Sequence, residues 1–381
     1  MVYFDNAATT KPTVAVLNTM TNIYLHSWEN PSALYTGAQN AYQFLEHYRG
    51  RIGEMLHCED GEVYFTSGGT ESDNWAIKSL AALGERSGKK RAVSTAIEHH
   101  AVLNALYALE LSGWEITYLT PSKLGVVDPV ALGKALRPDT AFVSVMYANN
   151  ETGAVQPIRE IGAICREHKI PFHVDAVQAV GHIPVDMESD NIDLLSLSAH
   201  KFKGPLGVGA LAVKGDIQLP PFIVGGAQER NMRAGTENLP GVAGMERALS
   251  DCCSNLQETI HEVANLRREL IAQIEKRIPG AHWVQTSSNC LPGIASFVIE
   301  GVESMPLILR LSGEGVCASA GSACNSGSLD PSHVLMAMGY DRELAHGAVR
   351  FSLSEDNTLD EVLYTVDKLS SIVSDLREMM C

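Results

Sequence analysis

Short apolar runs alternate with longer amphipathic stretches over the first 240 or so residues. The apolar runs are typical of buried strands, and we expect strands at residues 62–66, 91–94, 141–146, 172–174, 194–196 and 209–213. The stretches between them predict helices at residues 70–83, 101–111, 129–136 and 158–168. This alternation indicates βαβ units and therefore an α/β fold with a mostly parallel sheet covered on both faces.

The pattern changes near residue 238. A long helical stretch runs to about residue 277, and shorter segments follow at 294–299, 306–312 and 357–376. We interpret this part as a smaller α+β domain joined through a helix. The first dozen residues fit either domain, and we assign residues 1–11 and 256–381 to the smaller domain and 12–255 to the larger one.

Composition narrows the function classes. The 381 residues are 45% hydrophobic and 19% charged, as in ordinary globular proteins, and the net charge of −16 disfavours nonspecific binding to nucleic acid or anionic membranes. The apolar runs are too short to span a bilayer, and we see no signal peptide, so we expect a cytoplasmic protein. Eight cysteines without a CxxC pair predict neither a disulfide framework nor a metal site.

Two polar motifs follow predicted strands and carry candidate chemistry. Lys201 stands between a Ser/His cluster and a Gly/Pro turn, where a lysine can form a Schiff base beside phosphate-binding hydroxyls. Asp175 lies at the C-terminal end of the strand expected at residues 172–174, where it can pair with a protonated ring nitrogen. Gln178, three residues later, can donate to a ring oxygen. Taken singly, Lys201 also fits a solvated loop lysine, and Asp175 a helix cap.

Three further motifs have both a functional and an ordinary interpretation. Gly69 and Thr70 begin a helix whose free N–H groups suit a phosphate, or they form a plain capping box. His99 can stack on a planar ring or carry a proton, or it is a polar loop residue. Asn150 can bind a cofactor or a substrate, or it belongs to an asparagine-rich turn.

Cys324 lies in a run of small residues, GSACNSGSLDPS, that has nothing to bury it. This composition predicts an exposed loop. An exposed thiol is a liability unless it has a function, although a tolerated surface cysteine is the alternative.

Together these segments resemble the cysteine desulfurases of the IscS/NifS type, within the fold-type I (class V aminotransferase) enzymes that use pyridoxal 5′-phosphate (PLP). The resemblance covers nearly the whole chain, and its motifs occur in one order: DNAATT, NPS, TSGGTESDN, IEHHAV, ANNETG, HVDAVQ, SAHK, ERNMRAGT, GSACNSGSLDPS and HGAVRF. It implies a large domain with a seven-stranded sheet, a smaller domain that carries the cysteine loop, and PLP as the cofactor.

The resemblance implies a role for each matching residue that contacts the cofactor. Lys201 would hold PLP covalently, Asp175 would face its pyridine nitrogen, and Gln178 its phenolic oxygen. His99 would stack on the ring, and Asn150 would lie beside it. The phosphate would be bound by Gly69, Thr70, Ser198 and His200, together with Thr236 from the neighbouring subunit of a homodimer.

The resemblance also implies a reaction. Asn150 and Arg350 would hold the α-carboxylate of L-cysteine, with Asn30 nearby in the substrate site. Lys201 would remove the α-proton. Cys324 would take the sulfur as a persulfide, His99 would carry a proton, and alanine would leave. The sulfur would pass to an acceptor protein, either an iron–sulfur scaffold or a thiolation relay, and no metal would be required.

Some residues depart from the family pattern, and two other functions stay open. Ala227 and Gln228 replace a usual glycine and histidine, Asn231 replaces a common glycine, and Asn325 a frequent threonine. These departures concern the loop on the dimer side and the cysteine loop. A selenocysteine lyase or other PLP-dependent C–S lyase is the enzymatic alternative, and an inactive PLP-fold scaffold is the non-enzymatic one.

Overall fold

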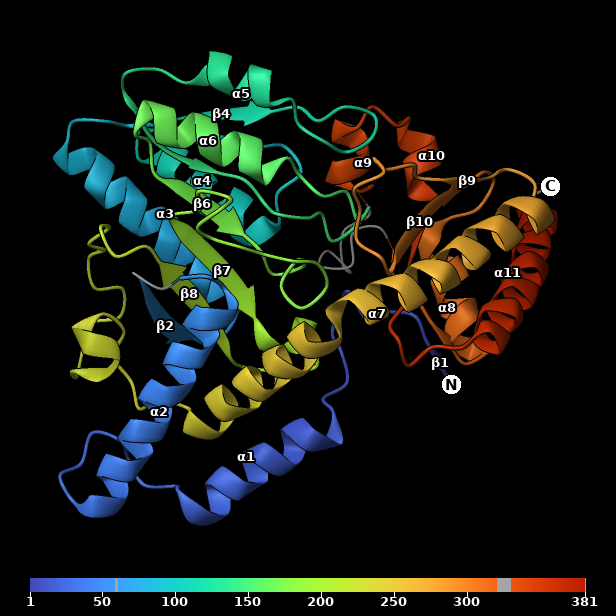
Figure 1. The fold of residues 1–381 in the computed structure, drawn as a ribbon. Helices are drawn as coiled ribbons and strands as arrows, with labels where there is room; N and C mark the ends of the chain where they lie inside the picture. Colours follow the sequence, from blue (N-terminus) through green and yellow to red (C-terminus); the bar gives the residue numbers. More distant parts are fainter. Residues whose placement is uncertain (59–60, 321–329, 381) are drawn as a thin grey trace.

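A seven-stranded sheet forms the centre of the larger part of the chain in a computed structural model, which describes residues 1–58, 61–320 and 330–380 (Figure 1). Its strands, in spatial order, are β2 (Glu62–Thr66), β8 (Gly209–Val213), β7 (Leu194–Ser198), β6 (Phe172–Asp175), β5 (Thr140–Ser144), β3 (Arg91–Thr95) and β4 (Glu115–Leu119). Strand β8 is antiparallel to both neighbours, and the other adjacent pairs are parallel. The expected α/β fold with a mostly parallel seven-stranded sheet is confirmed.

Helices cover both faces of this sheet. Helices α3 (Gly69–Arg86) and α4 (His100–Leu111) pack on one face, and α1 (Val14–His26), α2 (Thr36–Met55) and α6 (Ile158–His168) belong to the core on the other. Strand β7 shows the alternation that this requires: Leu194 packs with α3, whereas Leu195 and Leu197 pack with the opposite core. Helix α5 (Pro129–Ala135) lies beside α6.

The expected long helix is α7 (Leu239–Arg277), which runs from the sheet-containing part to the smaller part of the molecule (Figure 1). The smaller part holds an antiparallel sheet in the order β12-β10-β9 and a parallel pair, β1 with β11. Its elements are β1 (Val2–Tyr3), β9 (Ala281–Trp283), β10 (Ile294–Ile299), α8 (Ser304–Gly313), β11 (Val316–Cys317), α9 (His333–Ala337), α10 (Arg342–His346), β12 (Ala348–Ser352) and α11 (Leu359–Met380).

The division into domains stays an interpretation. One buried apolar cluster contains Leu239 to Leu249 of α7 with the large sheet, and another contains Val263 and Ile274 of the same helix with β10 and α11. The expected boundary at residue 255 therefore falls inside one continuous helix. Within the described ranges, no helix combines the length and the apolar character needed to cross a bilayer.

The N-terminal segment, residues 4–10, connects the two parts. Phe4 N–H donates to Cys317 O at 2.9 Å, Ala7 N–H donates to Ser352 Oγ at 2.9 Å, and Thr10 N–H donates to His200 O at 2.9 Å. The segment thus leaves the smaller part and reaches the large sheet just after β7. The pocket lies where this segment passes from the smaller part to the large sheet.

Candidate active site

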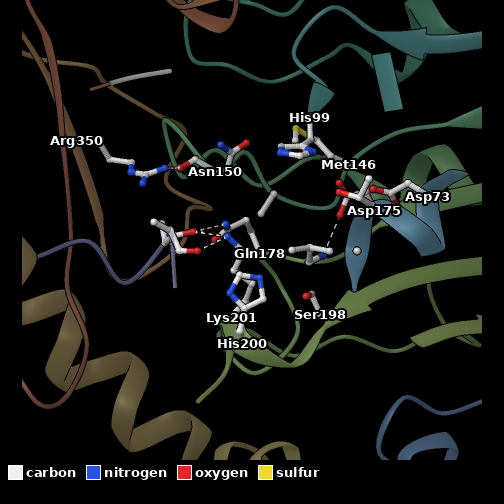
Figure 2. A pocket seen from close by; sticks show the side chains of 16 residues that line it. Asp73, His99, Met146, Asn150, Asp175, Gln178, Ser198, His200, Lys201 and Arg350 are labelled. Carbon is white, nitrogen blue, oxygen red and sulfur yellow. Dashed lines mark hydrogen bonds between the residues drawn. The ribbon is translucent and has the colours of Figure 1, made fainter. Parts of the chain in front are cut away.

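A cavity of about 310 Å³ opens at the carboxyl edge of the large sheet, facing the smaller part of the molecule. Its lining residues come from both parts (Figure 2): Ala7, Ala8, Gly69, Thr70, Asp73, His99, Met146, Ala148, Asn150, Asp175, Val177, Gln178, Ser198, His200, Lys201 and Arg350. Ligands of open α/β sheets bind at this edge because the carboxyl ends of parallel strands meet there. Arg350 and nine other residues predicted from the sequence line this cavity together.

Lys201 ends the short 3₁₀ helix η1 (Ala199–Lys201), which follows β7 directly. Its Nζ donates to Ala7 O at 2.7 Å and Ala8 O at 2.8 Å, and Gln178 Nε2 donates to Ala7 O at 2.9 Å. The N-terminal segment therefore supplies the carbonyl groups that orient both side chains. These contacts join residues that are nearly 200 positions apart.

Asp175 is buried at the end of β6 and accepts a hydrogen bond from Val177 N–H at 3.0 Å through Oδ1. Burial raises the pKa of this carboxyl to about 6, while the Val177 N–H and the charge of Lys201 oppose the rise. Asp73, one turn into α3, lies beside it (Figure 2).

His99 caps α4, because its Nδ1 accepts a hydrogen bond from Ala101 N–H at 3.1 Å. This bond assigns the proton of the neutral ring to Nε2. Burial lowers the pKa of His99 to about 4, and the charges of Lys201 and His100 lower it further. The ring is therefore neutral at neutral pH.

The start of α3 provides hydrogen-bond donors for a phosphate. Its first N–H groups lack partners within the helix and carry the positive end of the helix dipole. Gly69 is required by close approach, since a Cβ there would lie 2.6 Å from Val177 Cγ2. The Thr70 and Ser198 hydroxyls and the His200 ring line the same cavity. This donor set fits PLP: donors for a phosphate, a carboxylate for a ring nitrogen, an imidazole for a ring face and an amine for its aldehyde.

Arg350 occupies the opposite wall, on β12, and is 1% exposed. Its Nη2 donates to Asp5 Oδ1 at 2.9 Å and its Nη1 to Asn150 O at 2.8 Å. Within the described residues, its Nε is buried without a hydrogen-bond partner. A guanidinium in this position suits the carboxylate of an amino acid.

Two predicted residues do not line the cavity of the single chain. Asn30 is exposed between α1 and α2, where its Oδ1 accepts a hydrogen bond from Ser32 N–H at 2.9 Å. Thr236 is exposed between η2 (Gln228–Asn231) and α7. Their predicted roles stay predictions. Cys324, together with Asn325, lies outside the described residues.

The residues that flank the cysteine segment are both anchored at the wall of Arg350. Ser319 exchanges two backbone hydrogen bonds with Arg350, at 2.7 and 3.1 Å, and its hydroxyl donates to Asp5 Oδ1 at 2.7 Å. On the other flank, the Ser332 hydroxyl donates to the buried carboxyl of Glu151. Burial raises the pKa of Glu151 to about 7.

The departure at Asn231, in the ERNMRAGT segment, has a structural reason. Glu229, Arg230 and Asn231 have φ of 43°, 56° and 64°, the left-handed region that favours glycine. Asparagine tolerates this region better than most residues, so it can stand where glycine is common. Arg49 holds the turn through two hydrogen bonds to the Glu229 carboxylate, at 2.7 and 2.9 Å.

Sequence reasoning missed several residues of the site. Asp73 could have been found as an acidic residue among the buried positions of α3, between Ser72 and Ala76. Asp5, Ala7 and Ala8 give no such signal, because only long-range contacts bring them to the pocket. Within the described parts of the chain, no group of three or more His, Cys, Asp or Glu side chains is placed to hold a metal ion.

Comparisons with known proteins agree with this geometry. The family model for class-V aminotransferases matches residues 2–364. "Cysteine desulfurase IscS" of Methanosarcina thermophila is 44% identical over 378 residues, which cover 99% of this chain and 93% of the relative. The protein of the same name from Dictyoglomus turgidum is 44% identical over 376 residues, 99% of this chain and 95% of the relative. A solved structure titled "NIFS-LIKE PROTEIN" superposes with a TM-score of 0.92 at 36% identity, covering 98% of this chain and 99% of the other.

Proposed function

We propose, from the premise that this chain belongs to the class-V aminotransferase family and is a PLP-dependent cysteine desulfurase, that Lys201 is its catalytic base and Cys324 its sulfur acceptor. The reaction converts L-cysteine to L-alanine and leaves the sulfur on Cys324 as a persulfide. One observation carries the proposal: the Lys201 amine, from the sheet-containing part, and the Arg350 guanidinium, from the smaller part, line one cavity (Figure 2).

The sheet side of the pocket would hold the cofactor and move protons. PLP, when bound, supplies an electron sink for the substrate's carbon atoms. The Asp175 carboxylate would keep a proton on the ring nitrogen, and the start of α3 with Thr70, Ser198 and His200 would hold the phosphate. The Lys201 amine would take the α-proton of the substrate and could return it, and His99 would direct the Nε2–H of its neutral ring as a hydrogen-bond donor toward the reacting groups.

The opposite side would orient the substrate. Arg350 would grip the α-carboxylate with its planar fork, which a lysine cannot reproduce. Asn150 lies next to it (Figure 2), and its backbone carbonyl helps to hold the guanidinium in place. This arrangement selects a free amino acid, since a peptide offers no α-carboxylate at that point.

The sulfur step needs the Cys324 thiolate. It would attack the sulfur of the substrate, so that an S–S bond forms while the C–S bond breaks. The electron pair of the broken bond stays with the carbon, which takes a proton and leaves as alanine. The anchoring of Ser319 and Ser332 beside Arg350 supports this role. Cys324 is the fourth residue after Ala320, and such a length of chain spans at most about 14 Å.

We also propose a homodimer in which Thr236 and Asn30 act at the interface. Large apolar side chains on and between α1 and α2 are exposed in the single chain: Leu17, Tyr24, Leu25, Trp28, Leu34, Tyr35 and Tyr42. An apolar surface of this kind is typical of a subunit interface. Sedimentation of the holoenzyme should give the mass of two chains, and the mass of one chain would refute this part.

The acceptor of the persulfide sulfur would be a protein thiol, from an iron–sulfur scaffold or from a thiolation relay. We propose the cytoplasm as the place of action, because reducing conditions keep such thiols available.

Cys324→Ala tests the proposed function. The variant should retain the absorbance of bound PLP and lose sulfide release from L-cysteine in the presence of a reductant. Retained sulfide release would remove Cys324 from the mechanism. Retained turnover of selenocysteine alone would instead favour the selenocysteine lyase alternative.

A further inference from the structure

A cluster of three buried carboxyl groups, Asp73, Glu98 and Asp175, lies at the pocket, which Asp73 and Asp175 line. Asp175 and His173 are two residues apart on β6, so their side chains project from the same face of the sheet. Helix α3 packs on β6 and brings Asp73 Oδ1 to 3.6 Å from His173 Nε2. Glu98 lies between β3 and α4 and acts electrostatically on both aspartates.

The cluster is almost fully shielded from solvent. Asp73 is 1% exposed, Glu98 0% and Asp175 6%. In the described part of the chain, Asp73 Oδ1 and Glu98 Oε2 have no hydrogen-bond partner. The other oxygen of Glu98 accepts hydrogen bonds from Thr95 Oγ1 at 2.6 Å and Met146 N–H at 2.9 Å. An ionised carboxylate in such surroundings is costly unless a cation compensates it.

The charged and titratable groups that face the cluster supply too little positive charge for three anions. Lys201 acts on Asp175. His173 is fully buried, and both ring nitrogens contact hydroxyls, Ser144 Oγ at 2.9 Å and Ser196 Oγ at 3.0 Å. Burial lowers the pKa of His173 to about 3 and that of His99 to about 4, so both rings are neutral at neutral pH.

We infer that Asp73 and Glu98 are positioning residues that stay protonated and thereby leave Asp175 as the single anion of the cluster. The last part rests on the proposed function, in which Asp175 faces the ring nitrogen of PLP. Burial raises the pKa of Glu98 to about 8, and burial together with the charge of Asp175 raises that of Asp73. One negative charge is then directed at the pocket.

Infrared spectroscopy of the holoenzyme at neutral pH tests the protonation directly. With isotope-labelled aspartate or glutamate, the wild type should show the carbonyl band of a protonated carboxyl group. Asp73→Asn should remove the aspartate band, and Glu98→Gln should weaken the glutamate band, to which Glu151 also contributes because burial raises its pKa to about 7. If a variant does not fold, the wild-type spectrum still tests the inference, because the absence of protonated bands would refute it. Absence of both bands, as when Asp73 is ionised beside a protonated His173, would overturn the inference.

The pH dependence of stability gives an independent readout. A carboxyl group whose pKa is raised in the folded state binds a proton that the unfolded chain releases, so wild-type stability falls as pH rises toward that pKa. The melting temperature of Glu98→Gln relative to wild type should therefore increase from about pH 5 to about pH 8. Asp73→Asn should show the same trend.

Asp190→Asn is the matched control. Asp190 is also buried, but it pairs with Arg159 at 3.1 Å and accepts a hydrogen bond from Tyr147 Oη at 2.8 Å. Its replacement should lower stability without that increase, and an identical pH trend in all three variants would contradict the inference. A changed pH titration of PLP absorbance in Asp73→Asn, but not in Asp190→Asn, would support the link to Asp175. Protonated bands with unchanged absorbance would refute only that link.

Discussion

The two sides of the pocket are built differently. The sheet side consists of groups at or shortly after strand ends, such as Asp175 at the end of β6 and Lys201 at the end of η1 after β7, and its backbone is held by the sheet. The opposite side is assembled from distant segments, in which Asp5 joins Arg350 of β12 to Ser319 beside the cysteine segment. We conclude that the first side is suited to a fixed cofactor, and the second to substrate binding and sulfur removal. Substitutions on the sheet side should therefore impair PLP binding and proton transfer, whereas substitutions on the opposite side should weaken substrate binding.

The largest effect is expected for Lys201→Ala. Removing a general base lowers turnover by about 10²–10⁴-fold, and this variant also loses the covalent hold on the cofactor. Sulfide release and the PLP retained after dialysis would be measured. Lys203→Ala is the control, because Lys203 is a neighbouring lysine that pairs with Glu355 and Asp356. Turnover of Lys201→Ala within about tenfold of the wild type would contradict the assigned role.

His99→Gln should lower turnover by about 10²-fold, also on the sheet side. Because the pKa of His99 is lowered to about 4, the ring is neutral above that pH and is protonated only below it. The acid limb of kcat/KM between about pH 5 and pH 7 should therefore be the same in the variant and the wild type. Loss of that limb in His99→Gln would show that His99 titrates there.

Arg350→Lys, on the opposite side of the pocket, should weaken substrate binding without affecting the cofactor. It keeps the charge and loses the planar fork, which costs about 1.5–3 kcal/mol, or a roughly 10- to 100-fold rise in KM for cysteine. The absorbance of bound PLP should stay unchanged. Arg342→Lys, at the exposed start of α10, is the matched control and should have no effect. If Arg350→Lys loses PLP, the two sides are not separable.

The smallest effect is expected at Asn231, whose φ is 64°. Asn231→Gly should change the free energy of unfolding by no more than about 0.5 kcal/mol, since relief of strain and added freedom of the unfolded chain offset each other. Asn231→Val should lower it by about 1–2 kcal/mol. Denaturant unfolding measures both, and equal stabilities would show that the left-handed turn is not maintained.

The sheet was predictable because buried strands leave a local signal. The expected runs became β2, β3, β6, β7 and β8 with small shifts, whereas β5 ends at Ser144 rather than at residue 146. Strand β4 was missed because its first four residues are not fully buried, so it has no continuous apolar run. Helices α1 and α2 were missed as well, because exposed apolar residues such as Tyr24 and Tyr42 obscure the helical pattern.

The residues of the candidate site also divide into those with a local sequence signal and those without one. The strand ends gave a physical reason to single out His99, Asp175 and Lys201. Arg350 rested on the family resemblance alone, because a single arginine in a short strand has no local signature. The contacts of Lys201 with Ala7 and Ala8 depend on how the N-terminal segment crosses the sheet, and no short sequence pattern encodes that path.

The account depends most on the transfer of sulfur from the substrate to Cys324. The direct measurement is mass spectrometry of the peptide that contains Cys324, after brief exposure of the holoenzyme to L-cysteine with labelled sulfur and without reductant. We predict that this peptide gains the mass of one labelled sulfur atom, and that Cys324→Ala gains none while it retains bound PLP. Continued formation of alanine with no labelled sulfur on that peptide would contradict the account.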